Sequence, residues 1–313
     1  MEKNNNTRVT EFLILGFSAH SELHSLLFFG FLMLYLLTLM GNIVIIGVTC
    51  SNSHLHTPMY FFLSNLSFID ICYTSVTAPR LLTIFSEHNN IISFSACMTQ
   101  LYFFMSFAST EYLLLTAMAY DRYVAICDPM HYTIIMNKRA CILLASISWI
   151  TGFLESAPIA ACISRLQFCG SNEIDHFFCD IIPLLKLSCS ETYTSQIVIF
   201  TDGAIVGLTS FLLTLTSYVY IISSILKIHS VEGRHKAFST CSSHLTVVII
   251  FYGTVICVYM RPKSEYSVDQ SKVLSMLYVN VIPMLNPLIY SLRNKDVRGA
   301  LRKLVRYLFP CKM

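Results

Sequence analysis

A charged triplet, Asp121-Arg122-Tyr123, lies at the end of a long apolar segment, inside the string MAYDRYVAIC at residues 118–127. Charge is expensive beside hydrocarbon, so ionisable residues placed there usually carry a function. Arg122 has an acid next to it that can hold its guanidinium and an aromatic ring that can shield it. An arginine that can be held or released favours a conformational switch.

Four further acids fall within or near the apolar segments: Asp70, Glu111, Glu155 and Asp202. Each would cost several kcal/mol if it stayed charged and unpaired in lipid. We therefore expect all four side chains to face water or the interior of a bundle.

The segments that must position these residues are long and apolar. Of 313 residues, 55% are hydrophobic and 12% are charged, whereas a soluble domain carries roughly twice that charged fraction; the mean hydropathy is +0.61. A helix needs roughly 20 residues to cross about 30 Å of hydrocarbon. Segments of that length lie near residues 25–49, 58–79, 97–120, 140–162, 196–222, 238–260 and 272–291. The predicted fold class is therefore an all-α membrane protein, a seven-transmembrane helix bundle.

The distribution of charge predicts the orientation of the bundle. With the amino terminus outside, 13 of the 21 basic residues fall on inner segments, and ten acids fall on outer segments. Basic residues flanking a span are retained on the cytoplasmic side, so we expect a multi-pass plasma-membrane protein with an extracellular amino terminus. The basic excess then faces anionic membrane lipids, and nucleic acid is not an expected partner. Phe12–Phe17 is too short for a signal peptide, so the first span is its own targeting signal.

Three regions follow from these spans. Residues 1–24 form an extracellular tail, and residues 25–291 form the bundle, with a long outer loop at about 163–195. In residues 292–313 apolar side chains recur at helical spacing opposite basic ones, which predicts a short cytoplasmic amphipathic helix and tail. The apolar set is Val297, Leu301, Leu304, Val305 and Leu308.

Two further features concern the outer side. Asn5-Asn6-Thr7 predicts glycosylation of Asn5, whereas Asn65-Leu66-Ser67 matches the same pattern inside a span, where no transferase reaches. Four cysteines are expected in the oxidising space, which favours disulfides: Cys97, Cys169, Cys179 and Cys189. They allow three pairings. At least one bridge should join the long outer loop to the third span.

Five strings together resemble one family. MAYDRYVAIC, PMYFFLSNLSFID (58–70), Ser217-Tyr218, KAFSTCSSHL (236–245) and PMLNPLIYSLRNKDV (283–297) occur in order on the expected spans. The whole chain is thus similar to the vertebrate olfactory receptors, which are rhodopsin-like G-protein-coupled receptors. The resemblance implies an odorant receptor that binds a small, mostly apolar odorant within the bundle and activates a stimulatory heterotrimeric G protein that raises cAMP. It also implies a Cys97–Cys179 disulfide, with Cys169 and Cys189 as a second candidate pair.

The resemblance also assigns roles to individual residues. It places the ligand among Phe104, Met105, Ala108, Ser109, Asp202, Val206, Tyr252, Val255, Ile256, Tyr259, Met276, Val279 and Asn280. The activation switch comprises Asp121, Arg122, Tyr123, Tyr218, His244, Asn286, Pro287 and Tyr290. Asp70 and Glu111, near Asn286 and Ser291, are expected to hold a sodium ion that leaves on activation. No other cofactor is expected.

The seventh span carries two prolines, Pro283 and Pro287, which remove backbone donors and should kink the helix. We expect Asn286 to bond a freed carbonyl, and Tyr290 to swing toward Tyr218 and Arg122. The alternative is a permanently bent packing helix.

Other interpretations stay open at this stage. Any single residue of the expected ligand set can serve only to pack the bundle. His244 can be a core histidine with a satisfied hydrogen bond, and Asp70 and Glu111 can be core acids that are protonated or hydrogen-bonded. Asp202 can pair with an amine, accept a hydroxyl, or be neutral and bonded to a neighbouring helix. A transporter would show internal repeats with broken helices, and an intramembrane enzyme would show a catalytic motif. Neither pattern is found, so an enzyme is not expected, whereas a chemosensory role outside olfaction remains an alternative.

Overall fold

A computed structural model describes residues 9–16, 21–87, 90–169, 171–259, 268–293 and 297–300. Asn5 and most of the expected amphipathic helix lie outside this part of the chain, and so do the side chains of Tyr259 and Ser291. The assignments of these residues therefore stay predictions.

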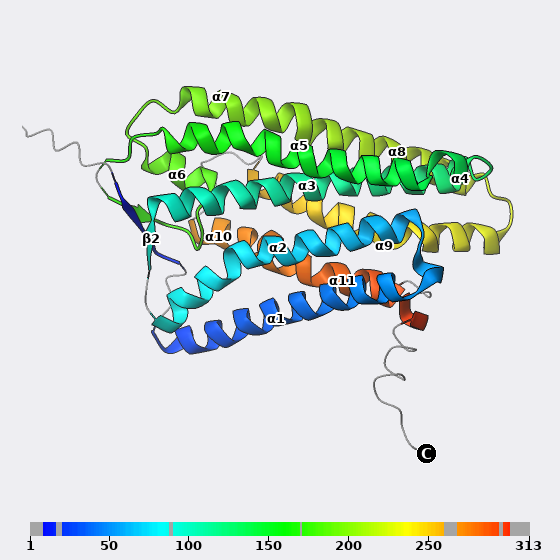
Figure 1. Cartoon of the computed structure of the whole chain (residues 1–313), viewed down its shortest axis with the longest axis horizontal. Coiled ribbons are helices and arrows are strands. Elements are labelled where there is room, and N and C mark those ends of the chain that lie inside the picture. The colour runs from blue at the N-terminus through cyan, green and yellow to red at the C-terminus, as the bar shows by residue number, and fades with distance from the viewer. Residues whose placement is uncertain are drawn as a thin grey trace, which may run out of the picture.

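Seven long helical segments run side by side in the described part of the chain (Figure 1), and each contains one predicted span. They are α1 (Ser21–Ser51), α2 (Pro58–Glu87), α3 (Phe94–Cys127), α5 (Lys138–Ser164), the run α7 (Tyr193–Asp202), η2 (Gly203–Leu208) and α8 (Thr209–Leu226), α9 (Val231–Tyr259), and the run α10 (Val268–Met276), η3 (Leu277–Val281) and α11 (Ile282–Arg293). Short helices lie between them: η1 (Ser53–Leu55), α4 (Tyr132–Ile135) and α6 (Ile181–Leu187). The predicted helical bundle is confirmed.

Five of these segments are apolar enough by length and composition alone to cross a membrane, and α9 makes six if its two halves count as one span. The segment that falls short is α2. It carries a polar face that is turned into the bundle, where Ser67, Asp70, Thr74 and Thr77 are each at most 2% exposed. Because those polar groups are buried against protein and not lipid, α2 can span without a uniformly apolar sequence.

Polar side chains mark several helix boundaries. Ser93 precedes α3 and its hydroxyl accepts a hydrogen bond from the Ala96 amide, and Asn137 does the same for Ala140 at the start of α5. Such caps bind amides that have no partner within the helix. The fifth and seventh spans each contain a π-helical segment, η2 and η3, and such segments are common at functional sites.

A three-stranded sheet closes one end of the bundle, which sequence reasoning missed. β1 (Glu11–Ile14) pairs antiparallel with β2 (Ile91–Ser93) and parallel with β3 (Glu173–Ile174). Phe12 and Ile14 are fully buried in a core shared with Cys97 and Phe168. Part of the expected tail at residues 1–24 is therefore a packed strand. Disulfides join Cys97 to Cys179 and Cys169 to Cys189 at this end of the molecule, so we call it the disulfide end, and the opposite end, where Arg122 lies, the arginine end.

Candidate functional site

The charged triplet is held in one arrangement at the arginine end of α3. Arg122 donates from Nε to Asp121 Oδ2 at 2.9 Å, and a second, shorter bond joins Arg122 Nη2 to the same oxygen. Tyr132 on α4 donates to Asp121 Oδ1 at 2.8 Å. Asp121 is fully buried and Arg122 is 9% exposed, so the guanidinium charge is neutralised locally and shielded from solvent. The structure thus pairs Arg122 with the neighbouring acid that the sequence suggested could hold it.

Tyr218 and His244 join the fifth and sixth spans one layer deeper. The Tyr218 hydroxyl and His244 Nδ1 are 2.6 Å apart, and the two rings stack at 5.8 Å with an interplanar angle of 25°. Tyr218 is 3% exposed and His244 is fully buried. A short hydrogen bond between buried side chains is a strong contact between α8 and α9, and it would break if α9 moved outward.

The mid-bundle acids lie where the sequence predicts them. Asn286 Nδ2 donates to both carboxylate oxygens of Asp70, at 3.2 and 3.0 Å. Glu111 is 2% exposed and close enough to Asp70 for their charges to interact. Among the described residues, Glu111 Oε1 and Asn286 Oδ1 are buried without hydrogen-bond partners. Carboxylate and amide oxygens left unsatisfied in one buried layer are the donor set that a hard cation prefers.

The expectation for Asn286 needs a correction. Pro287 has no amide hydrogen, so the carbonyl of Pro283 loses its helical partner. That carbonyl accepts a 3.1 Å hydrogen bond from Asn42 Nδ2 on α1, whereas Asn286 bonds Asp70. The helices approach closely here because α1 has a glycine: a Cβ on Gly41 would lie 2.9 Å from Pro287 Cγ.

Tyr290 completes the predicted switch set. Its ring is 2% exposed, and its hydroxyl has no hydrogen-bond partner among the described residues. Tyr218 and Arg122 are near enough for electrostatic interaction with it. Pro287 lies one turn away within α11, and Tyr123 is partly buried and stacks on Tyr120.

The expected ligand residues largely form one packed region in the half of the bundle toward the disulfide end. Phe104 stacks on Tyr73 with ring centroids 4.9 Å apart and contacts Phe178 of the long loop at 4.6 Å and Tyr278 at 6.1 Å. We call these four rings the aromatic cluster. Tyr252 and Val279 belong to the same core, and Met105, Ala108, Val255 and Met276 pack against it. Ser109 and Asn280 are also buried.

Three of the expected ligand residues stand apart from this core. Ile256 is 41% exposed, and Val206 on η2 is only half-buried. Asp202 ends α7, next to the π-helical segment, and its charge interacts with that of Glu155 on α5. The structure thus separates Asp202 from the aromatic cluster and groups it with another acid.

Sequence reasoning noticed Glu155 but missed its partners. Tyr112 on α3 donates a short hydrogen bond to Glu155 Oε1, and its hydroxyl oxygen lies 3.1 Å from Ser109 Oγ. The remaining oxygen, Glu155 Oε2, is buried without a partner among the described residues. Tyr112 follows Ser109 by three residues, so the two share a helix face, and that spacing was the available signal.

The long loop covers the disulfide end of the bundle. Bridges join Cys97 to Cys179 and Cys169 to Cys189. Lys272 of α10 is 1% exposed and lies 2.5 Å from Asp175 of the loop, measured from Nζ to Oδ1. Burial lowers the pKa of His176 to about 3, with Lys272 as the next cause. Burial also raises the pKa of Asp180 to about 6, although the Ile181 amide donates to its carboxylate.

Comparisons with known proteins identify the family of this chain. A family model described as olfactory receptor matches residues 31–307. The chain is 51% identical to olfactory receptor 5B21 of Homo sapiens over 306 residues, covering 98% of this chain and 99% of that protein. It is 53% identical to olfactory receptor 5A1 of Homo sapiens, with 96% of each chain covered, and 50% identical to olfactory receptor 1G1 of Gorilla gorilla gorilla, with 97% of each covered.

Proposed function

The chain belongs to the olfactory receptor family, and we propose that it binds a small, mostly apolar odorant against the aromatic cluster and signals through a stimulatory G protein that raises cAMP. As a member of that family it is an odorant receptor built as a multi-pass membrane protein, and it is not an enzyme. The ligand position, the G-protein type and the plasma-membrane location are our proposals.

One observation carries the ligand proposal. Within the apolar region around Phe104, Asn280 Nδ2 and the Tyr252 hydroxyl are buried without hydrogen-bond partners among the described residues, although Thr116 and Thr214 lie close to Tyr252. Small-molecule sites combine apolar walls with a few such polar groups. An odorant with one carbonyl, ester or hydroxyl oxygen would satisfy Asn280 while its carbon chain replaces contacts between the aromatic rings.

Signalling then follows from a shift between two packings. In the structure Arg122 is held by Asp121, Tyr218 by His244 and Asn286 by Asp70. An odorant that binds better when α9 and the seventh span rearrange lowers the free energy of that arrangement. Release of Arg122 and Tyr218 would open the arginine end to the G protein. The unbonded Tyr290 hydroxyl is placed to meet them.

The proposal is tested by a cAMP reporter screen of this chain against a chemically diverse odorant panel, with Arg122→Ala as the switch variant. Arg139→Ala, an exposed arginine at the same end, is the matched control. We expect odorant responses in the parent and in Arg139→Ala and none in Arg122→Ala at equal surface expression. Responses that survive Arg122→Ala would contradict the switch mechanism.

Asp202 needs a separate test because its role in ligand binding is open. Paired with Glu155, it would attract a basic amine, whereas a neutral Asp202 would bond a hydroxyl or a neighbouring helix. Panels of amines and alcohols with matched carbon skeletons separate these roles. Loss of only the amine responses in Asp202→Asn indicates ion pairing, and unchanged responses to every agonist remove the anchor role.

We also propose a sodium ion between Asp70 and Glu111. The support is the pair of unsatisfied oxygens, Glu111 Oε1 and Asn286 Oδ1, beside two buried acids. A bound cation would neutralise charge in this layer and stabilise the packing seen here. Among the described residues there is no group of three or more His, Cys, Asp or Glu side chains fit for a metal, so this site would rely on the amide and on water.

We propose that the amino terminus is extracellular and that Asn5 is glycosylated. The inner excess of basic residues supports this orientation, and so does the presence of both disulfides beside β1. The mobility of the intact receptor on a gel should increase after glycosidase treatment. An Asn5→Gln variant should already run at the faster position, and a shift that persists in this variant would contradict the assignment.

A further inference from the structure

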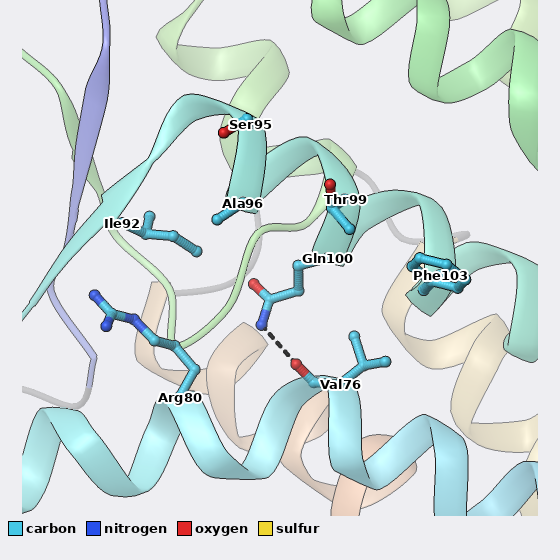
Figure 2. Close-up of a pocket in the computed structure, with 8 residues that line it drawn as sticks. All are labelled: Val76, Arg80, Ile92, Ser95, Ala96, Thr99, Gln100 and Phe103. Carbon is cyan, nitrogen blue, oxygen red and sulfur yellow. Dashed lines mark hydrogen bonds between the residues drawn. The ribbon is translucent and has the colours of Figure 1, made fainter.

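A hollow of about 450 Å³ lies on the outside of the bundle at the disulfide end, between α2 and α3, away from the proposed odorant site. Its walls are mainly apolar, from Val76, Ile92, Ala96 and Phe103. Figure 2 shows Arg80 of α2 beside Ile92 at one side of the hollow, Phe103 at the opposite side, and the polar residues Ser95 and Thr99 on α3. Ser95, Ala96 and Thr99 are exposed, so the hollow opens outward.

The charge of Arg80 is not neutralised in the described part of the chain. One guanidinium nitrogen makes a short hydrogen bond to the Ile91 carbonyl, while Nε is buried without a partner. The three ion pairs found among described side chains do not include Arg80. A half-buried cation bonded only to a neutral carbonyl favours an anion as its neighbour.

The floor of the hollow is fixed by Gln100. Its Nε2 donates to the Val76 carbonyl at 2.9 Å, the bond drawn in Figure 2, and its Oε1 accepts from the Cys179 amide at 3.0 Å. These bonds join α2, α3 and the disulfide-bonded loop at one point. The walls are therefore preformed, which lowers the entropy cost of binding a ligand.

The depth of Arg80 matches the boundary between hydrocarbon and headgroups. α2 has 30 residues, so it is about 45 Å long and exceeds a hydrocarbon core of about 30 Å by about 15 Å. Arg80 lies seven residues before the end of α2 at Glu87, or about 10 Å along the axis. Long basic side chains at this depth reach toward the headgroup layer.

We propose that this hollow binds a phospholipid of the membrane leaflet at the disulfide end, with its phosphate on Arg80 and an acyl chain along Val76, Ala96 and Phe103. The phosphate satisfies the guanidinium, the hydroxyls of Ser95 and Thr99 bond headgroup oxygens, and the apolar walls exclude a purely ionic ligand. The proposal rests on the membrane location of the family and does not depend on the odorant site. A bound lipid would join the outer halves of α2 and α3.

Native mass spectrometry of the purified full-length receptor with a phosphatidylglycerol tests this proposal. Arg80→Gln should weaken phospholipid binding roughly tenfold, since a charge-assisted bond to a partly buried arginine is lost. Ala96→Trp fills the hollow without changing charge and should weaken binding to a similar degree. Arg165→Gln is the matched control, because Arg165 is an exposed arginine at the same end of the molecule, and it should bind the lipid like the parent.

Two further probes separate the parts of the ligand. Diacylglycerol with the same acyl chains and glycerol phosphate without chains should each bind the parent at least tenfold more weakly than the phospholipid. Equal binding of glycerol phosphate would show an anion site and overturn the lipid proposal. Equal phospholipid binding by the parent and Arg80→Gln, or an equal loss in Arg165→Gln, would overturn it too. Odorant responses of Arg80→Gln provide the check on folding, because this variant leaves the proposed odorant site intact.

Discussion

Replacing His244 with phenylalanine should raise the activity of the receptor in the absence of odorant. The variant keeps an aromatic ring to stack on Tyr218 but removes the 2.6 Å hydrogen bond between the Tyr218 hydroxyl and Nδ1. This bond joins α8 to α9 only while α9 stays in its present position. We expect the arrangement with α9 moved outward to lack the bond, so that its loss destabilises one state alone.

The size of the effect follows from burial. Tyr218 is 3% exposed and His244 is fully buried, so the bond lies at the upper end of the usual net range of about 0.5–1.5 kcal/mol. A loss of about 1.4 kcal/mol changes the ratio of the two states about tenfold. Basal cAMP, divided by the amount of receptor at the cell surface, should rise by up to that factor while the active fraction is small.

A second variant separates this mechanism from general destabilisation. Tyr218→Phe removes the same bond but also the hydroxyl that we expect to reach Arg122 and Tyr290 after release, so its basal activity should not rise and its odorant response should fall. His229→Phe, an exposed histidine before α9, is the control for the substitution itself. Basal activity of His244→Phe within twofold of the parent would refute the reasoning, and so would parallel changes in His244→Phe and Tyr218→Phe.

Three further predictions concern packing, pH and sodium. Gly152→Ala should destabilise the receptor by about 1–3 kcal/mol, because the added Cβ would lie 2.8 Å from the Thr110 amide nitrogen and the backbone cannot move away easily. Thermal unfolding measures this loss, with Gly30→Ala as the control because nothing lies within 4 Å of a Cβ there. Equal losses of stability in the two variants would count against the packing argument. The pKa of His176 is lowered to about 3 in the folded protein, so below about pH 6.5 this histidine binds a proton in the unfolded protein but not in the folded one, and the free energy of unfolding falls as the pH drops. Between pH 7 and 5 the parent should lose about 2 kcal/mol more of this free energy than His176→Phe. Identical pH profiles of the two proteins would contradict the assignment. Replacing sodium by N-methylglucamine should increase agonist potency in the parent, because we expect sodium to stabilise the packing in which Asn286 bonds Asp70. Glu111→Gln should reduce this effect of sodium on potency about fivefold or more. An unchanged effect in this variant would show that Glu111 does not belong to the site.

Local patterns in the sequence predicted much of the switch. The pairing of Arg122 with Asp121 joins sequence neighbours, and the Tyr218–His244 contact joins two members of the switch set that the resemblance named. The partner of the Pro283 carbonyl was predicted wrongly. Asn286 is closer in sequence, but Asn42 is the donor, because α1 approaches α11 closely at Gly41. A contact across 241 positions depends on how two helices cross, which no single segment encodes.

The proposed ligand region shows the same division. The family resemblance names apolar and aromatic residues on the third, sixth and seventh spans, and most of them do share one core. Asp202 directly precedes the π-helical segment η2, which begins at Gly203, and no sequence pattern predicted this segment. Consequently the sequence grouped Asp202 with Phe104, whereas the structure groups it with Glu155.

By itself the sequence determined the spans and the position of the charged triplet, because hydrocarbon thickness and the cost of burying charge act on each segment separately. The five sequence strings also identified the family. Only the tertiary structure decided which buried polar groups satisfy one another, which remain unsatisfied, and that residues 11–14 pair with strands about 80 and 160 positions away. Strands of two to four residues carry little local signal and form only where the closed bundle brings them together. The unpaired charge of Arg80 likewise becomes informative only once the structure shows that no described carboxylate pairs with it.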